Sequence, residues 1–216
     1  MEIKKNVAFV GMFGSGKTEL AINYAMMLAK KEENVALADL DFVSPYFRSR
    51  EKKDLMQQLG IKVIVPHEKY IWADTPIIPP EVFGALSNKE TRTVLDIGGE
   101  EDGVVVLGYL RAFMKNTTIF FVVNTRRPFT DSADGIVEFF KKLRDRARVD
   151  FDYLVVNTNL ADQTSEEIIR EGEEIVSKAS EILGVPIAFT VVPSFLKDCN
   201  CKYEKFIIDR YLQLPW

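Results

Sequence analysis

With 216 residues, 47% of them hydrophobic, the chain is long enough to bury a substantial core, and we expect residues 1–216 to form one α/β domain. The net charge of −4 gives no electrostatic reason to expect general nucleic-acid binding, and no apolar run approaches the roughly 18 residues of a membrane span. Two cysteines make no disulfide framework, and a strand predicted within six residues of the start leaves no room for a signal peptide, so we expect a cytoplasmic protein.

A glycine-rich segment at residues 11–18 lies between a predicted strand at residues 7–10 and a helical pattern. It reads Gly-Met-Phe-Gly-Ser-Gly-Lys-Thr, and its glycines allow a bend in which successive backbone N–H groups point at one phosphate. Lys17 can reach the β- and γ-phosphates of a nucleotide, and the Thr18 hydroxyl can bind Mg²⁺. An ordinary glycine-rich turn is the weaker interpretation, because a strand and a helix flank the segment. The residues expected to contact a nucleotide here are Gly11, Phe13, Gly14, Ser15, Gly16, Lys17, Thr18 and Glu19.

Strands and helices alternate along the rest of the chain. The stretch at residues 66–80, with four prolines and the lone His67, is predicted to be a long irregular loop. The alternation predicts one mostly parallel sheet of about seven strands with helices on both faces, the three-layer α/β arrangement of a P-loop protein. Besides the first strand, strands are predicted at residues 35–38, 61–65, 91–97, 118–123, 153–156 and 187–192. Besides the helix after the glycine-rich loop, helices are predicted at residues 52–59, 104–114, 132–146, 165–183 and 204–212.

Acidic residues stand at the ends of two predicted strands. Asp39 and Asp41 follow one of them, and Asp96 lies at the end of another. Open α/β sheets place their ligands at the carboxyl ends of the strands, so these side chains are expected beside the loop. We expect Thr18, Asp39 and Asp96 to hold Mg²⁺ directly or through water. With Lys17, the two acids Asp39 and Asp41 form the expected catalytic set; we assign Asp41 to the attacking water, although the division between the two stays open.

These motifs together resemble the CobQ/CobB/MinD/ParA group of nucleotide-binding proteins, and in particular the MinD/ParA type of P-loop ATPase. The wider class contains nitrogenase iron protein, signal-recognition GTPases and metallocentre-assembly nucleotidases. The resemblance rests on the loop, on the strand that ends Ala-Asp-Leu-Asp and on Asp-Ile-Gly-Gly at residues 96–99. It implies that Asp41 lies in switch I and that residues 96–99 form switch II. It also implies that Asn157 meets the adenine and that a loop beginning at Pro193 closes over the base.

One position departs from the resemblance. Most MinD/ParA members have a lysine directly after the first loop glycine, and it reaches the phosphates of a partner subunit; here the residue is Met12. Methionine carries no charge, so ATP-driven dimerisation through such a lysine does not carry over. An arginine could supply the charge in cis or in trans. The sequence does not select among the candidates, each of which could equally be a surface residue: Arg48, Arg50, Arg126 and Arg127.

The base specificity is predicted from the segment that begins at Asn157. GTPases of this class read guanine with Asn-Lys-x-Asp, whereas the matching segment here is Asn-Thr-Asn-Leu and ends at Leu160. Leucine cannot accept the hydrogen bonds that guanine donates, which favours ATP. Asp162 lies two residues too late and could serve only after a shift of the loop.

The pair Cys199 and Cys201 allows two interpretations. Two thiolates from each of two subunits could form a tetrahedral metal site. One pair supplies only two ligands, however, and free cysteines are more often small apolar residues. The apolar interpretation is therefore the stronger.

The predicted function is a Mg²⁺-dependent ATP-binding protein, a slow ATPase that acts as a nucleotide-driven switch. Its expected cofactors are ATP and Mg²⁺, and its expected partner is another protein or a second copy of the chain. Met12 leaves open a nucleotide-sensing module with negligible turnover, and GTP-dependent metallocentre assembly is a further alternative. A small-molecule kinase, with the loop at residues 66–80 closing over an acceptor, ranks lowest, because no acceptor-binding cluster is found.

Overall fold

The computed structural model describes residues 2–31, 34–41, 53–66 and 77–212. Its strands are β1 (Asn6–Val10), β2 (Val35–Leu40), β3 (Ile61–Ile64), β4 (Arg92–Ile97), β5 (Thr117–Val123), β6 (Tyr153–Val156), β7 (Ile187–Pro193) and β8 (Lys205–Ile208). Within the described ranges they form one sheet of eight strands in the order β3-β2-β4-β1-β5-β6-β7-β8, and every neighbouring pair is parallel. The predicted architecture is confirmed, with one strand more than the expected seven.

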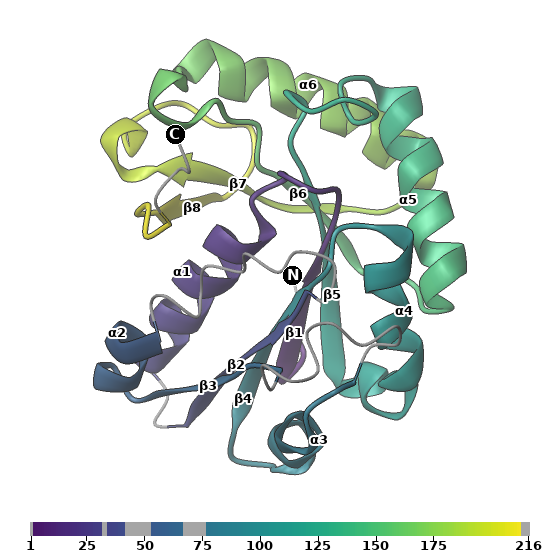
Figure 1. Cartoon of the computed structure of the whole chain (residues 1–216). Helices are drawn as coiled ribbons and strands as arrows, with labels where there is room; N and C mark the ends of the chain where they lie inside the picture. Colours follow the sequence, from purple (N-terminus) through teal and green to yellow (C-terminus); the bar gives the residue numbers. More distant parts are fainter. Residues whose placement is uncertain (1, 32–33, 42–52, 67–76, 213–216) are drawn as a thin grey trace.

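Helices cover both faces of this sheet (Figure 1). The α-helices are α1 (Lys17–Ala29), α2 (Lys53–Gln58), α3 (Pro80–Ser87), α4 (Glu101–Tyr109), α5 (Ala133–Ala147) and α6 (Glu166–Leu183). Short 3₁₀ helices lie at η3 (Arg111–Asn116), η4 (Ala161–Gln163) and η5 (Ser194–Leu196). None of the helices in the described ranges is long and apolar enough to cross a bilayer.

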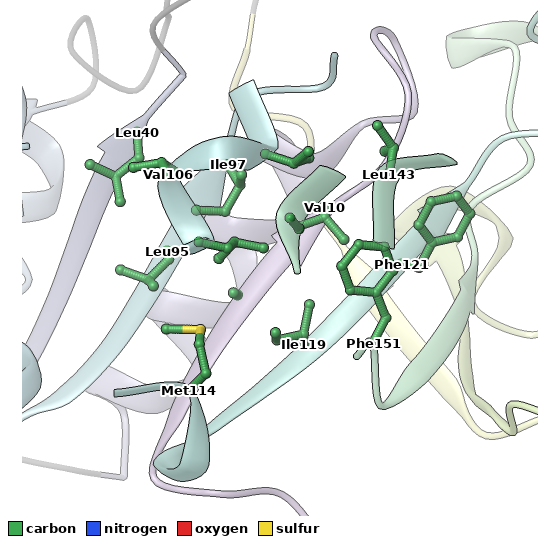
Figure 2. Close-up of a cluster of buried hydrophobic side chains, with 14 of the residues drawn as sticks. Val10, Leu40, Leu95, Ile97, Val106, Met114, Ile119, Phe121, Leu143 and Phe151 are labelled. Carbon is green, nitrogen blue, oxygen red and sulfur yellow. The ribbon is translucent and has the colours of Figure 1, made fainter. Parts of the chain in front are cut away.

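Successive residues of a central strand face opposite layers. In β1, Ala8 and Val10 belong to the core cluster that packs under α3, α4, α5 and α6. Val7 and Phe9 belong to the cluster under α1 and α2, which the chain after β8 also covers. Figure 2 shows the first cluster, in which Val10 and Phe121 of neighbouring strands lie near Leu143 of α5. Strands buried on both faces are nearly continuous apolar runs, which is why the sequence predicts them well.

Two elements differ from the prediction. Residues 204–212 were expected to be helical, but they contain β8, which pairs with β7 at the edge of the sheet. Phe206 and Ile208 alternate with exposed residues and pack against the α1 cluster, so pairing with an existing strand overrides the local helical pattern. The helix α3 is an addition, and its start at Pro79 and Pro80 is a signal that the sequence does contain.

Some predictions lie outside the described residues. Among them are residues 67–76, with His67, which make up most of the predicted loop, and two of the four candidate arginines, Arg48 and Arg50.

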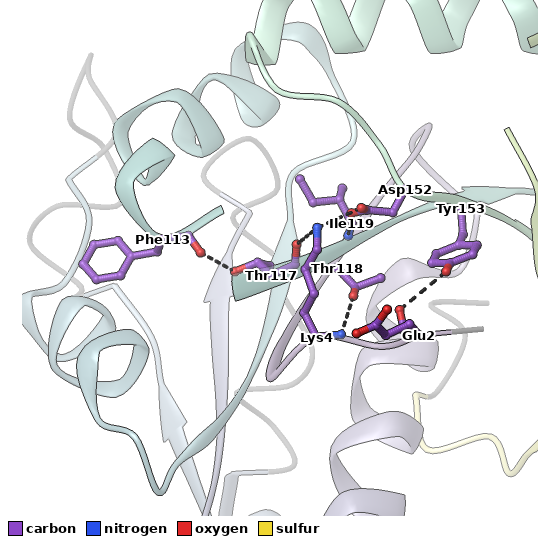
Figure 3. A network of polar contacts seen from close by, with 8 residues as sticks. All are labelled: Glu2, Lys4, Phe113, Thr117, Thr118, Ile119, Asp152 and Tyr153. Atoms are coloured by element: carbon purple, nitrogen blue, oxygen red, sulfur yellow. Dashed lines mark hydrogen bonds and ion pairs between the residues drawn. The ribbon is translucent and has the colours of Figure 1, made fainter. Parts of the chain in front are cut away.

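The end of the sheet that precedes β1 is held by a polar network around Asp152 (Figure 3). Asp152 Oδ1 accepts from Lys4 Nζ at 2.8 Å, and its Oδ2 accepts from the Ile119 N–H at 2.8 Å. The Lys4 N–H donates to Thr118 Oγ1 at 2.8 Å. The network joins the starts of β1, β5 and β6, and the opposite ends of these strands carry the candidate site.

Candidate functional site

The loop between β1 and α1 has the bent backbone that its glycines predict. Gly11, Gly14 and Gly16 take φ angles of +146°, +74° and +85°. A Cβ on Gly11 would also lie 2.3 Å from the Val122 carbonyl oxygen of β5. The loop therefore needs glycine both for conformation and for space. Gly16 is the N-cap of α1, so the positive end of that helix faces the loop.

Strand ends bring carboxylates to the same edge of the sheet. Asp39 of β2 is paired in register with Asp96 of β4, and both side chains are buried. Thr18 Oγ1, at the start of α1, donates to Asp96 Oδ2 at 2.7 Å. The Asp41 N–H donates to Asp39 Oδ1 at 3.0 Å. The three predicted metal ligands, Thr18, Asp39 and Asp96, are thus gathered at the carboxyl ends of the strands. Asp41 lies two residues after Asp39.

Asp96 is a strongly perturbed acid. Its burial raises its pKa to about 7, while Lys17 and the hydrogen bond from Thr18 oppose this and Asp41 adds to it. Asp96 Oδ1 is buried and has no hydrogen-bond partner among the described residues, and the same holds for Ser15 Oγ in the loop. Buried polar atoms are nearly always hydrogen-bonded, so two orphaned oxygens beside one loop indicate a place for a ligand.

Lys17 is held inside the loop. Its Nζ donates to the Met12 carbonyl at 3.2 Å, and the side chain is buried. Burial lowers the pKa of Lys17, whereas Asp96, Asp41 and Glu100 raise it. The site's buried cation therefore lies within the field of three acidic side chains.

The segment that follows β4 packs directly against the loop. A Cβ on Gly99 would lie 2.7 Å from Lys17 Nζ and 2.7 Å from the Phe13 backbone nitrogen. A Cβ on Gly98 would lie 3.1 Å from Asp41 Oδ1. Glycine at both positions therefore lets this segment touch the loop, its lysine and Asp41 together.

The end of β6 meets the loop on another side. Asn157 Nδ2 donates to the Ser15 carbonyl at 2.6 Å, and a Cβ on Gly16 would lie 2.3 Å from that nitrogen. Asp162, the one acid that could have read guanine, is exposed instead. Its carboxylate forms an ion pair with Arg210 at 2.9 Å. The structure thus brings Asn157 to the loop and engages Asp162 elsewhere.

Three further residues that are predicted to contact a nucleotide, Glu19, Phe13 and Pro193, lie in different surroundings from one another. Glu19 accepts the N–H groups of Tyr211 and Leu212 at 2.7 and 3.1 Å, so its carboxylate ties the segment after β8 to α1. Phe13 exposes 64% of its surface at the outer side of the loop. Pro193 ends β7 and precedes η5. Contact of these residues with a nucleotide stays a prediction.

The structure distinguishes one of the four candidate arginines, Arg127, by its position. Arg127 Nε donates to the Gly14 carbonyl at 3.1 Å, whereas Arg126 pairs with Glu171 of α6. Arg127 therefore contacts the loop, and no sequence signal could have separated it from its neighbour.

The two cysteines lie beside each other between η5 and β8. Their sulfur atoms are 3.6 Å apart, and Cys199 is buried against Ile169 and Val192. Burial, together with the hydrogen bond and charge of the neighbouring Cys199, raises the pKa of Cys201 to about 12. In the described part of the chain no three His, Cys, Asp or Glu side chains gather as a metal site. The apolar surroundings of Cys199 favour the apolar interpretation, and a metal site shared by two subunits stays a hypothesis.

A family model of the CobQ/CobB/MinD/ParA nucleotide-binding domain matches residues 11–194. The chain belongs to this family. The match begins at the first glycine of the loop and ends just after Pro193, so it includes the loop and the carboxyl ends of β2, β4 and β6. The family resemblance of the motifs is thereby confirmed. Among curated protein sequences none matches the chain.

Solved structures share the fold of this family member at low sequence identity. Cell division protein FtsY from Thermotoga maritima is 20% identical with a TM-score of 0.60, and the match covers 87% of this chain and 61% of that one. FlhF complexed with GTP/Mg²⁺ is 16% identical with a TM-score of 0.54, covering 87% and 65%. Signal recognition particle receptor FtsY from Elizabethkingia anophelis is 15% identical with a TM-score of 0.56, covering 93% and 62%. The match thus spans less than two thirds of each of these proteins.

Proposed function

We propose that the protein is a Mg²⁺-dependent nucleoside triphosphatase that prefers ATP and acts as a nucleotide-driven switch. The observation that carries the proposal is the Thr18–Asp96 contact, in which one carboxylate oxygen accepts the hydroxyl at 2.7 Å and the other is buried without a partner among the described residues. Phosphoryl transfer to water requires positioning and charge neutralisation rather than a nucleophilic side chain, and this site supplies donors, a cation and acids.

The donor set suits Mg²⁺. This ion usually keeps several waters and binds through one or two carboxylates together with substrate phosphates, so it needs no cluster of three protein ligands. Thr18 and Asp96 would hold it directly, and Asp39, paired in register with Asp96, would act through water. When bound, Mg²⁺ would neutralise charge on the β- and γ-phosphate oxygens.

The remaining side chains have distinct roles in this proposal. The backbone N–H groups of residues 11–18 and the Lys17 ammonium bind the phosphates. Asp41 lies against Gly98, and its backbone is fixed by Asp39, so it can orient a water for attack on the γ-phosphate. Gly99 touches Lys17 and the loop, so the segment before α4 must respond to whatever the loop holds. That response is the proposed switch.

The preference for ATP is supported by the base side of the site. Asn157 contacts the Ser15 carbonyl, while Asp162 is exposed and paired with Arg210. The acid of this segment is thus engaged in a surface ion pair, which supports ATP over GTP. GTP is the alternative, because FlhF, which shares the fold, has been solved with GTP/Mg²⁺.

The test combines binding with turnover. Dissociation constants for ATP and GTP, followed by single-turnover phosphate release, are measured for the native chain and for Lys17→Ala, Asp41→Ala and the exposed control Lys178→Ala. We expect tighter binding of ATP, loss of binding in Lys17→Ala, and in Asp41→Ala retained binding with release slower by about a hundredfold or more. The control should match the native chain.

Two other outcomes would redirect the proposal. Phosphate release that is unchanged in both site variants would exclude catalysis by these residues. Tight binding without any release, even with candidate partner proteins added, would favour the nucleotide-sensing module. Sedimentation with and without ATP would report whether the partner is a second copy of the chain.

A further inference from the structure

We propose that Arg127 is a nucleotide-binding residue, and that its guanidinium contacts a phosphate oxygen of the bound nucleotide. The inference rests on the proposed function, since it adds a residue to the same site. Arg127 Nε donates to the Gly14 carbonyl at 3.1 Å. A Cβ on Gly14 would lie 2.9 Å from that nitrogen and 3.2 Å from the Arg127 Cζ, so the guanidinium lies on the loop itself.

The turn that carries this side chain is fixed. It follows β5, which pairs with β1 along its length, so the turn and the loop leave neighbouring strands side by side. The Arg127 N–H donates to the Asn124 carbonyl at 3.2 Å, and Thr130 Oγ1 donates to the same carbonyl at 2.8 Å. Asn124 Oδ1 in turn accepts the N–H of Asn159 at 3.2 Å. The backbone thus holds Arg127 in place before any ligand arrives.

The neighbouring arginine is differently engaged. Arg126 forms an ion pair with Glu171 on α6, so its charge is compensated there. Arg127 uses one of its five N–H donors on the Gly14 carbonyl, and among the described residues its two terminal nitrogens donate to no acceptor. These nitrogens form a planar fork that matches two phosphate oxygens.

The negative charge of a bound nucleotide and of the acids near Lys17 also favours a second cation at the site. A nucleoside triphosphate is strongly anionic, and the buried cation that meets it, Lys17, lies in the field of Asp96, Asp41 and Glu100. An exposed guanidinium that donates to one neutral carbonyl gains little stability by that contact. A bound phosphate therefore explains the position of the Arg127 guanidinium better than a contribution to folding stability does.

The test compares Arg127→Ala, Arg127→Lys and the matched control Arg126→Ala. Dissociation constants for ATP, ADP, AMP and adenosine are measured by calorimetry or competition in the presence of Mg²⁺. Loss of a charge-assisted contact should weaken ATP binding in Arg127→Ala by about tenfold to a hundredfold and leave adenosine binding unchanged. Arg127→Lys should restore part of the affinity, because the charge returns without the fork. Arg126→Ala should bind ATP like the native chain.

Each contrary result has a separate meaning. Native ATP affinity in Arg127→Ala would overturn the inference and leave the proposed function standing. An equal loss for ATP and adenosine would assign Arg127 to loop packing and also overturn it. A native chain that binds neither ATP nor GTP would overturn both the proposed function and the role of Arg127. Urea unfolding of each variant shows that any loss of affinity is not a loss of folding.

Discussion

Replacing Asp96 by asparagine tests two properties of this buried acid: whether its pKa is raised in the folded chain, and whether its carboxylate binds a cation. The folded pKa of about 7 lies above the ordinary value of 3.8, so folded Asp96 keeps a proton that the unfolded chain has already released. Between these two values the free energy of unfolding therefore falls as pH rises, and above the folded pKa the loss is complete. At about 1.4 kcal/mol per pKa unit, the free energy of unfolding falls by at most about 4 kcal/mol over this range.

The measurement is urea unfolding of the native chain and of Asp96→Asn, with a chelator and without nucleotide, from about pH 4 to about pH 8. All other titratable groups are shared, so the difference between the two profiles reports Asp96. We expect the variant to gain stability relative to the native chain as pH rises. Adding Mg²⁺ with ATP at the upper end should stabilise the native chain more than the variant, because the variant lacks the carboxylate proposed to hold Mg²⁺.

Asp152→Asn is the control for this experiment, since that carboxylate lies at the opposite end of the sheet. Its stabilisation by Mg²⁺ and ATP should match that of the native chain. Parallel profiles for the native chain and Asp96→Asn would refute the reasoning about the buried acid. Equal stabilisation of both by Mg²⁺ and ATP would refute the metal role of Asp96, whatever the profiles show.

Two further predictions concern packing and thiol chemistry. Gly172→Ala on α6 should lower the free energy of unfolding by about 1–3 kcal/mol in urea, because its Cβ would lie 2.1 Å from Thr158 Oγ1. Gly84→Ala on α3, with nothing within 4 Å of its Cβ, should instead be neutral or stabilising by up to about 1 kcal/mol, and equal losses would contradict the packing argument. The alkylation rate of Cys201, followed by mass spectrometry, should still be rising above pH 9.0, because burial raises its pKa to about 12; a plateau near 9.0 would show an ordinary thiol.

Much of the fold follows from local signals. β1 and β5 are apolar at most positions because both of their faces are buried, and the sequence shows this without any partner strand. The longest helix is bounded by Ser165, whose side chain accepts the Ile168 N–H, and by Gly184 in the left-handed conformation. The loop at residues 11–18 is equally local, since its glycines, lysine and threonine all lie within this one short segment. The family, the sheet and the bent glycine-rich loop could therefore be predicted.

Other features depend on residues that are distant in the chain. β8 is a strand because β7 offers an edge, and no pattern within residues 204–212 contains that information. The raised pKa of Asp96 comes from burial, which the charge of Lys17 opposes, and the sequence cannot weigh the two effects. Arg127 and Gly14 are 113 positions apart, so only the pairing of β1 with β5 could bring that arginine to the loop. The sequence by itself determined the family and the glycine-rich loop, and the tertiary structure decided which charges surround that loop.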